Sequence, residues 1–406
     1  MKNIFIIIAG AMLLYSCNNN HTVEEQANQP LLLSHKDDRA SCVYLTKDEN
    51  NKSVISWCEK NKVGKSFFFI SFFNVNKNAF DTAISVPIEQ NAIFMEEAMP
   101  KVAVKSDGTI IAVYETNAPT KQNGWAGFVH YIQSFDKGKT WTQPLCVHQD
   151  TASGKTHSYA AIARLSDGEI GACWLDESLG NKDQGRAIKF AKTNGRNGFQ
   201  NEILIDSFAC QCCRTALSSD NKGNVSILFR DILPGSVRDI AISTSSDDGK
   251  TFSHAVSFSN DDWVINGCPE DGPSVINKND TTHATWFTGG KNKGMYYAEL
   301  NNKNDVVFKK QISSNGRFIQ TCLLPGGESV IAYNEDIHGT DSIYSKIVVN
   351  KIDNNNFFKA DVTGDKPHAN YPVVCSLDTN HIIVAWTDNN AIYYRVINTN
   401  VLSAAG

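Results

Sequence analysis

Short apolar segments that end in an aromatic residue recur along the chain, separated by polar stretches rich in Gly, Asn and Asp. In most of them a carboxylate follows the aromatic residue closely, as in Ile55–Glu59 and Ala172–Asp176. Short apolar runs bounded by turn residues predict β-strands, and no helical period competes beyond the N-terminal segment. The aromatic residues stand 47 to 60 residues apart, at Trp57, Tyr114, Trp174, Phe229, Trp286, Tyr333 and Trp386. That interval fits a unit of four antiparallel strands and predicts seven repeats.

One octapeptide occurs twice, as Ser134–Trp141 and as Ser245–Phe252, with Ser, Asp, Gly and Thr at equivalent positions. The Asp carboxylate can accept hydrogen bonds from its own turn, and Gly allows a positive φ. Four further repeats carry an aromatic residue at the corresponding position after a polar turn, namely Phe80, Phe199, Phe308 and Phe357. Six repeats therefore keep the position of the octapeptide, four of them in degraded form.

The octapeptide resembles the Asp box, the bacterial neuraminidase repeat (BNR) of the sialidase superfamily. This resemblance implies an all-β fold, a β-propeller of four-stranded blades. The repeat count favours seven blades in a single domain over residues 28–406, and six blades, as in sialidases, are the alternative. The seventh repeat ends too early for a fourth strand. We expect Gln29–Leu33 to supply it, which would close the ring and cover both sheet edges.

The N-terminus has the features of a bacterial lipoprotein signal. Residues 1–17 contain Lys2, a short apolar stretch and the sequence Leu14–Cys17, which resembles a lipobox. We expect Cys17 to be lipidated, residues 18–27 to form a polar tether, and the protein to be anchored in a membrane of the cell envelope, facing the periplasm or the exterior. The apolar stretch is too short to span a membrane comfortably.

The net charge of the chain indicates which classes of binding partner to expect. A net charge of −5, without an arginine-rich run, argues against nucleic acid as the main partner. We expect a monomer that binds a carbohydrate, and nothing in the sequence indicates a cofactor.

Up-and-down blades place the octapeptide turns and the turns between the first and second strands at one end of the ring. The other end, with the central channel, is the expected ligand site. There the sequence places carboxylates suited to acid–base chemistry and cationic groups suited to a carboxylate ligand. The catalytic candidates are Glu115, Asp176, Asp231 and Asp271, and the ligand-binding candidates are His157, Arg214, Arg230 and Arg238.

Two loops at this end carry cysteines, in Cys210–Arg214 and in Gly267–Pro273. In an exported protein we expect a disulfide between Cys268 and one of Cys210, Cys212 and Cys213. Binding of zinc or another soft metal by these thiols is the alternative, and no metal is assigned. Cys42 and Cys58 lie symmetrically about a turn and form a second candidate disulfide.

The cysteine and arginine motifs resemble those of exported sialidase-like repeat proteins. Sialidases bind a carboxylate through three arginines and use a tyrosine activated by glutamate; Tyr371 and Glu335 are conceivable counterparts. Three hypotheses follow: a sialidase-like glycoside hydrolase acting on an anionic glycan, a non-catalytic glycan- or protein-binding propeller, or another hydrolase or lyase. Under the hydrolase hypothesis and the binding hypothesis, Arg214→Ala is predicted to abolish activity or ligand binding with little effect on folding.

Overall fold

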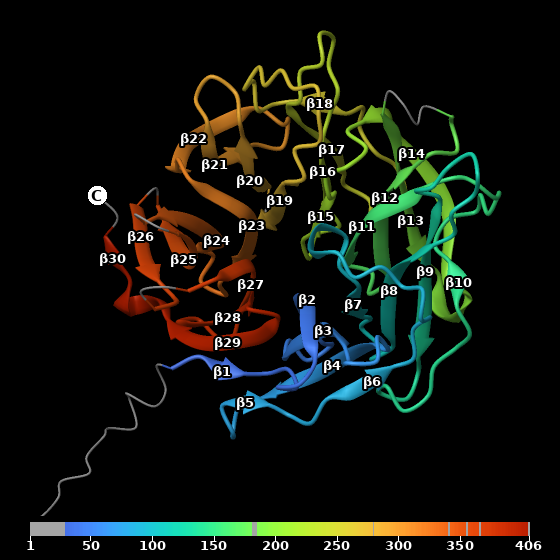
Figure 1. Ribbon diagram of the computed structural model, residues 1–406. Coiled ribbons are helices and arrows are strands. Elements are labelled where there is room, and N and C mark those ends of the chain that lie inside the picture. The colour runs from blue at the N-terminus through green and yellow to red at the C-terminus, as the bar shows by residue number, and fades with distance from the viewer. Residues whose placement is uncertain are drawn as a thin grey trace, which may run out of the picture.

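The computed structural model describes residues 29–180, 185–278, 280–339, 342–354, 356–364 and 367–404. The described strands form seven antiparallel sheets around a central axis, one sheet per blade (Figure 1). The prediction of a β-propeller is confirmed, with seven blades rather than six. Blades one to four comprise β2 (Arg39–Lys47) to β6 (Ile84–Val86), β7 (Lys101–Val104) to β10 (Leu145–Cys146), β11 (His157–Arg164) to β14 (Phe199–Ala209), and β15 (Ala216–Ser219) to β18 (Val256–Ser257). Blades five to seven comprise β19 (Ser274–Lys278) to β22 (Val306–Ser313), β23 (Gly316–Leu323) to β26 (Asn356–Asp361), and β27 (Ala369–Ser376) to β29 (Ala391–Asn398).

The ring is closed by the N-terminal segment. Strand β1 (Leu31–Leu32) pairs with β29 and is the outer strand of blade seven. The backbone N–H of Leu33 extends this pairing with a 2.8 Å hydrogen bond to the carbonyl of Ile392. The expected role of Gln29–Leu33 is therefore confirmed. A short strand β30 (Ser403–Ala404) pairs with β26 and covers the edge of blade six.

The recurrent aromatic residues pack between neighbouring blades. Trp174 of blade three lies in one apolar cluster with Val113 and Tyr131 of blade two. Trp286 of blade five packs in the same way against Leu228 of blade four. All seven residues are at most 1% exposed. Because burial of an aromatic side chain removes a large apolar area from water, this repeated contact accounts for the regular spacing seen in the sequence.

Both octapeptides form the predicted turns between third and fourth strands. In the first, the Asp136 carboxylate accepts hydrogen bonds from the backbone N–H of Thr140 at 2.8 Å and from its hydroxyl at 2.6 Å. Gly138, with φ +84°, has the left-handed conformation that the turn requires. Ser166, in the turn between β11 and β12, bonds to Asp248 of the second octapeptide. The two kinds of turn thus share one end of the ring, which we call the box end.

The opposite end carries the loops between second and third strands and the connections between blades. Within the described residues, no helix has the length and apolar character needed to cross a membrane. The predicted signal segment, tether and lipidation site Cys17 lie outside the described residues.

Candidate functional site

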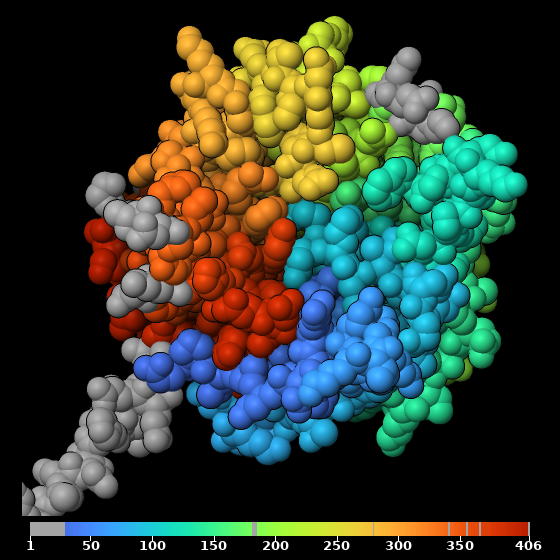
Figure 2. All heavy atoms as spheres, in the orientation of Figure 1, coloured from blue at the N-terminus to red at the C-terminus, as the bar shows by residue number. Residues whose placement is uncertain are grey.

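Nine residues enclose a cavity of about 340 Å³ at the end opposite the boxes. They come from two inter-blade connections and from the starts of three first strands. We call this cavity the mouth pocket. Its lining residues are Met95, Glu96, Glu97, Tyr159, Pro269, Glu270, Arg317, Phe318 and Tyr371. Along the ring axis, segments from early (blue to cyan), middle (yellow) and late (red) parts of the sequence meet at the centre (Figure 2).

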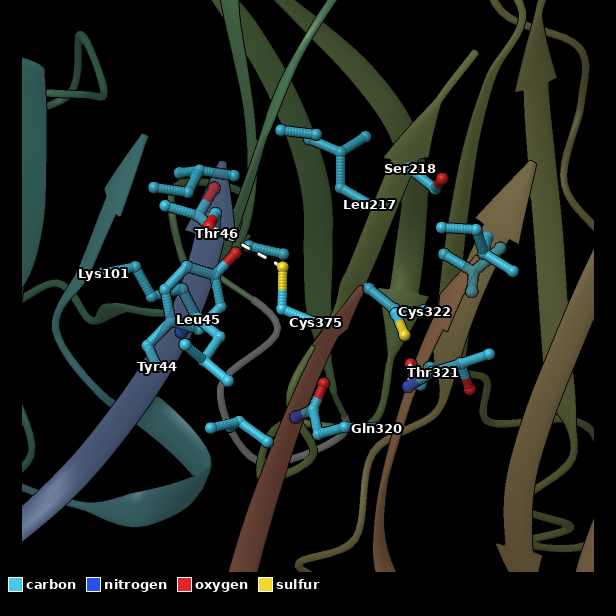
Figure 3. Close-up of a pocket in the computed structure, with 18 of the residues that line it drawn as sticks. Tyr44, Leu45, Thr46, Lys101, Leu217, Ser218, Gln320, Thr321, Cys322 and Cys375 are labelled. Atoms are coloured by element: carbon cyan, nitrogen blue, oxygen red, sulfur yellow. Dashed lines mark hydrogen bonds between the residues drawn. The ribbon is translucent and has the colours of Figure 1, made fainter. Parts of the chain in front are cut away.

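Below the mouth pocket, the inner strands surround the central channel. The channel holds a second cavity of about 370 Å³ lined by residues of strands β2, β7, β11, β15, β19, β23 and β27. Side chains such as Tyr44, Lys101, Gln320 and Cys375 gather around it (Figure 3). Arg214 and Met99 line both this channel and a narrow void that reaches Glu97 and Tyr371. The mouth pocket is therefore the outer part of the channel, with Arg214 at its floor.

The first strands of four blades are bulged at the same level. Their registers shift beside Cys42, Tyr159, Phe318 and Tyr371, and each of these residues has a positive φ between 52° and 59°. Such a backbone costs about 1–3 kcal/mol for a bulky residue and is concentrated at functional sites. Three of the four bulges place an aromatic side chain on the wall of the mouth pocket. The strained backbone positions thus coincide with the wall of the mouth pocket.

Glu96 and Glu97 lie on a 3-10 turn, Glu96–Ala98, between blades one and two. Glu97 forms a buried ion pair with Arg214 and accepts a 3.1 Å hydrogen bond from the N–H of Gly272. Burial still outweighs the attraction of Arg214 and raises the pKa of Glu97 to about 7. Burial likewise raises the pKa of Glu96 to about 7, against hydrogen bonds from the Thr387 hydroxyl and the Cys42 N–H. Both groups can therefore exchange protons near neutral pH.

Arg317 is the arginine on the wall of the mouth pocket. Its Nε donates to Asp271 at 2.5 Å, and one terminal nitrogen donates to the Pro269 carbonyl at 3.3 Å. Asp271 is fully buried, and burial raises the pKa of its carboxyl despite Arg317. The Arg317 side chain keeps 33% of its surface exposed. Asp271 thus holds a partly exposed guanidinium in a fixed orientation, which suits it to bind an oxygen of a ligand.

Two tyrosines complete the wall. The ring of Tyr371 lies 4.2 Å from that of Phe318, centroid to centroid. Burial, with the nearby Glu96 and Glu97, raises the pKa of Tyr371 to about 12. Burial and Glu115 also raise the pKa of Tyr159. Both hydroxyls therefore remain protonated at neutral pH and can donate hydrogen bonds.

Among the sequence-predicted residues, Arg214, Asp271 and Glu115 lie at or next to the mouth pocket. Arg214 is buried and bonds to Glu97 and, at 2.5 Å, to the carbonyl of Ile319. Glu115 is buried beside Lys101; burial raises the pKa of the carboxyl to about 7 and lowers that of the amine to about 8. Asp271 contacts the pocket through Arg317.

Asp176 and His157 belong to a separate buried network. Asp176 accepts hydrogen bonds from His157 at 3.0 Å and from the Trp174 indole at 2.8 Å, and Ser178 and Lys189 also pair with it. These donors outweigh burial and lower the pKa of Asp176. His157 stacks on His148, with centroids 3.7 Å apart. Neither side chain lines the mouth pocket. The roles predicted for His157 in ligand binding and for Asp176 in catalysis therefore stay predictions.

Arg230, Arg238 and Asp231 lie near the cysteine loop. The guanidinium of Arg230 donates to the carbonyls of Arg238, Asp271 and Phe287, all within 3.0 Å. It therefore ties together a loop of blade four, the connection between blades four and five, and a strand of blade five. Burial raises the pKa of Asp231 to about 6. Arg238 lines a different cavity of about 710 Å³, together with Cys210, Cys212 and Cys268.

No disulfide joins any of the ten cysteines of the described residues in the structure. The Sγ atoms of Cys210, Cys212 and Cys213 lie within 4.8 Å of one another, and Cys268 is exposed at the edge of the same cavity. Cys42 and Cys58 are buried on adjacent strands of blade one. The two predicted disulfides stay predictions.

Arg317 and Phe318 were not among the site residues predicted from the sequence. Tyr371 was named there only with Glu335, as a conceivable counterpart of the tyrosine and glutamate of sialidases. In the structure Glu335 bonds to Ser313 and Lys359, while the carboxyls that act on Tyr371 are Glu96 and Glu97. A signal was available in the sequence. Near the start of four first strands, a polar residue is followed by Cys or an aromatic residue, as in Ser41-Cys42, Ser158-Tyr159, Arg317-Phe318 and Asn370-Tyr371.

Comparison with known proteins agrees with this fold. The profile of a BNR repeat-like domain matches residues 82–283. No curated protein sequence matches the chain significantly. A PL25 ulvan lyase bound to -[GlcA(1-4)Rha3S]- has a TM-score of 0.54 at 10% identity, over 93% of this chain and 95% of its own.

Two further solved structures are similar. The intramolecular trans-sialidase of Ruminococcus gnavus, in complex with oseltamivir carboxylate, has a TM-score of 0.52 at 10% identity, over 94% of this chain and 97% of its own. The GH93 α-L-arabinofuranosidase of Fusarium graminearum, with arabinobiose, has a TM-score of 0.51 at 16% identity, over 77% of this chain and 96% of its own. At these identities the likeness concerns the fold alone. Over residues 82–283 the chain is similar to the BNR repeat-like domain, which agrees with the propeller fold that these structures share.

Proposed function

We propose that the mouth pocket binds an anionic glycan and cleaves a glycosidic bond by acid–base chemistry. One observation carries this proposal: Glu96 and Glu270 line one pocket from two different inter-blade connections, with Arg317 on the same wall. The connections lie between blades one and two and between blades four and five. In a ring of seven, these positions are nearly opposite, so the two carboxyls face a ligand from two sides.

Glu96 is the proposed acid. Its pKa of about 7 keeps a substantial share of the carboxyl protonated near neutral pH, unlike an ordinary surface glutamate. Glu96 gives its proton to the glycosidic oxygen as the bond from that oxygen to the anomeric carbon breaks. A water molecule adds to the anomeric carbon and gives its proton to Glu270. This is the two-carboxylate scheme of glycoside hydrolysis.

Arg317 is the proposed ligand-binding cation. Its guanidinium would bind the carboxylate or sulfate of an anionic sugar, and Asp271 would hold it in place. The neutral hydroxyl of Tyr371 would donate to a ring substituent, while the Tyr371 and Phe318 rings support the sugar face. An ulvan lyase, a trans-sialidase and an α-L-arabinofuranosidase share this fold, which supports a glycan as the ligand class without selecting one.

The test is turnover by purified protein on a panel of sialosides, uronate-containing oligosaccharides and neutral arabinosides, followed by product chromatography. Glu96→Gln and Glu270→Gln are expected to lower kcat by about a hundredfold or more. Glu49→Gln, at the box end, is the matched control and should keep full activity. Equal activity of Glu96→Gln and the parent protein would exclude Glu96 as the acid.

Non-catalytic glycan binding is the second candidate, and the Phe318–Tyr371 ring pair favours it, because such pairs support sugars without any reaction. Binding on a glycan array without turnover of any bound sugar would decide for this candidate. In that case Tyr371→Ala should lose binding, whereas Glu96→Gln should keep it.

We also propose that the protein is an envelope lipoprotein attached through Cys17. Incorporation of radiolabelled fatty acid in cells, lost in Cys17→Ala, would support the anchor. Label that persists in the variant would contradict it.

A further inference from the structure

A cluster of three thiols lies beside the mouth pocket. Strand β14 ends at Ala209, and the next residues turn sharply before β15 begins at Ala216. The N–H of Cys210 bonds to the Arg230 carbonyl at 2.8 Å, which fixes the start of this turn. Cys210, Cys212 and Cys213 are each at most 7% exposed, and Ile232 packs against them.

The geometry of the cluster points to a site for a soft metal ion, and we propose that it binds monovalent copper through three thiolates. The Sγ atoms of Cys210 and Cys212 are 3.7 Å apart, and all three sulfurs lie within 4.8 Å of one another. A metal–sulfur bond of about 2.3 Å in a trigonal arrangement needs sulfurs roughly 4 Å apart. Thiolate is the ligand that monovalent copper prefers.

The number of ligands distinguishes copper from zinc. A structural zinc site takes four ligands. Cys268 lines the same cavity but lies outside the group of mutually close sulfurs, and no other His, Cys, Asp or Glu of the described residues joins that group. Three close thiolates therefore match a three-coordinate monovalent ion better than a tetrahedral divalent one.

The surroundings supply access and charge compensation. The cavity of about 710 Å³ reaches Cys210 and Cys212 from the side of the exposed Cys268, so an ion has an entry path. Arg238 lines this cavity, and its buried Nε and one terminal nitrogen have no hydrogen-bond partner. Binding releases three thiol protons and takes up one Cu(I), without oxidation or reduction. The resulting negative charge is partly offset by Arg238.

The thiol cluster is connected to the mouth pocket by adjacent residues of the same segment. Arg214 follows Cys213 directly and forms the ion pair with Glu97 at the pocket floor. An ion held by the three thiolates would fix this segment and stabilise the fold. The proposal does not depend on glycan cleavage and is tested separately from it.

The experiment is an anaerobic titration of the reduced full chain with Cu(I) against a chromophoric chelator. One bound equivalent per chain is expected, with three sulfur ligands by X-ray absorption and a higher melting temperature. Cys212→Ser and Cys210→Ser should each weaken binding by about a hundredfold or more. Cys268→Ser, and Cys146→Ser on blade two as a matched control, should bind copper like the parent protein.

Circular dichroism and urea unfolding identify any serine variant that fails to fold, and the sulfur count of the parent protein then remains the decisive measurement. Copper binding unchanged in folded Cys212→Ser would overturn the proposal. So would thiol titration of unreduced, denatured protein that finds two of the three cysteines joined in a disulfide. Preferential binding of zinc that requires Cys268 would overturn the assignment of copper.

Discussion

Carboxyl groups at the box end and at the mouth end of the ring experience opposite environments. Hydrogen bonds from Thr140 lower the pKa of Asp136 to about 2, and those from Ser245 and Thr251 outweigh slight burial and lower that of Asp247 to about 2. At the mouth, burial raises the pKa of Glu96, Glu97 and Glu115 to about 7. At the box end, ionised carboxylates hold the turns in place through hydrogen bonds. At the mouth end, burial disfavours the ionised form of the carboxyl groups, as expected of groups that act as acids or bases near neutral pH.

The largest expected effect tests the mouth end. Arg214→Ala removes the partner of a buried carboxylate, so we expect a loss of about 3–5 kcal/mol in the free energy of unfolding. This revises the sequence-based expectation that the variant folds normally. Urea unfolding measures it, and the double variant Arg214→Ala with Glu97→Gln should recover part of the loss. An unchanged unfolding midpoint for Arg214→Ala would show that the pair does not stabilise the fold.

The second largest expected effect is a fall in the free energy of unfolding as the pH rises, caused by Glu96. Because the pKa of Glu96 is raised from 4.5 to about 7, its contribution to stability is complete below pH 4.5 and is lost as the pH rises to about 7. The loss is about 2 kcal/mol, reduced from the full shift because Glu96 is partly exposed. Urea unfolding of the parent protein and Glu96→Gln across this range measures it. The difference between the two should change with pH; a constant difference would contradict the raised pKa.

The smallest effect concerns the box end. Asp247→Ala removes hydrogen bonds to the N–H and hydroxyl of Thr251, at 2.9 and 2.7 Å, and should cost about 1 kcal/mol. Because the pKa of Asp247 is lowered, its contribution is present above pH 3.8 and is lost as the pH falls toward about 2. Thermal unfolding measures the loss, and glycan turnover or binding should not change. Loss of ligand binding without loss of stability would place function at the box end.

The fold was predictable because its determinants are local and repeated. The spacing from Trp57 to Trp386 reflects one buried aromatic residue per blade, and the Ser-Asp-Gly-Thr pattern encodes a turn that closes on itself. The closing strand near Leu31 could also be predicted, since the seventh repeat lacks a strand. Loop position also predicted that Glu115, Arg214 and Asp271 lie at the mouth end.

The site was only partly predictable, because its contacts join residues far apart in the chain. Arg214 pairs with Glu97 across the ring, and Arg317 at the start of blade six pairs with Asp271 in the connection before blade five. In the sequence, Arg214 and Arg230 cannot be distinguished from arginines that bind a ligand. In the structure, both donate hydrogen bonds to buried groups of the protein. Burial, which sets the pKa of each carboxyl, is likewise a property of the closed ring.

The sequence alone therefore favoured seven blades over six and predicted the register of the repeats and the ring closure, because each depends on short-range patterns. Only the tertiary structure decided which charged groups lie exposed in the mouth pocket, which are paired beneath it, and which three thiols converge. These depend on how seven separate loops meet around one axis, and no local pattern in the chain specifies that meeting.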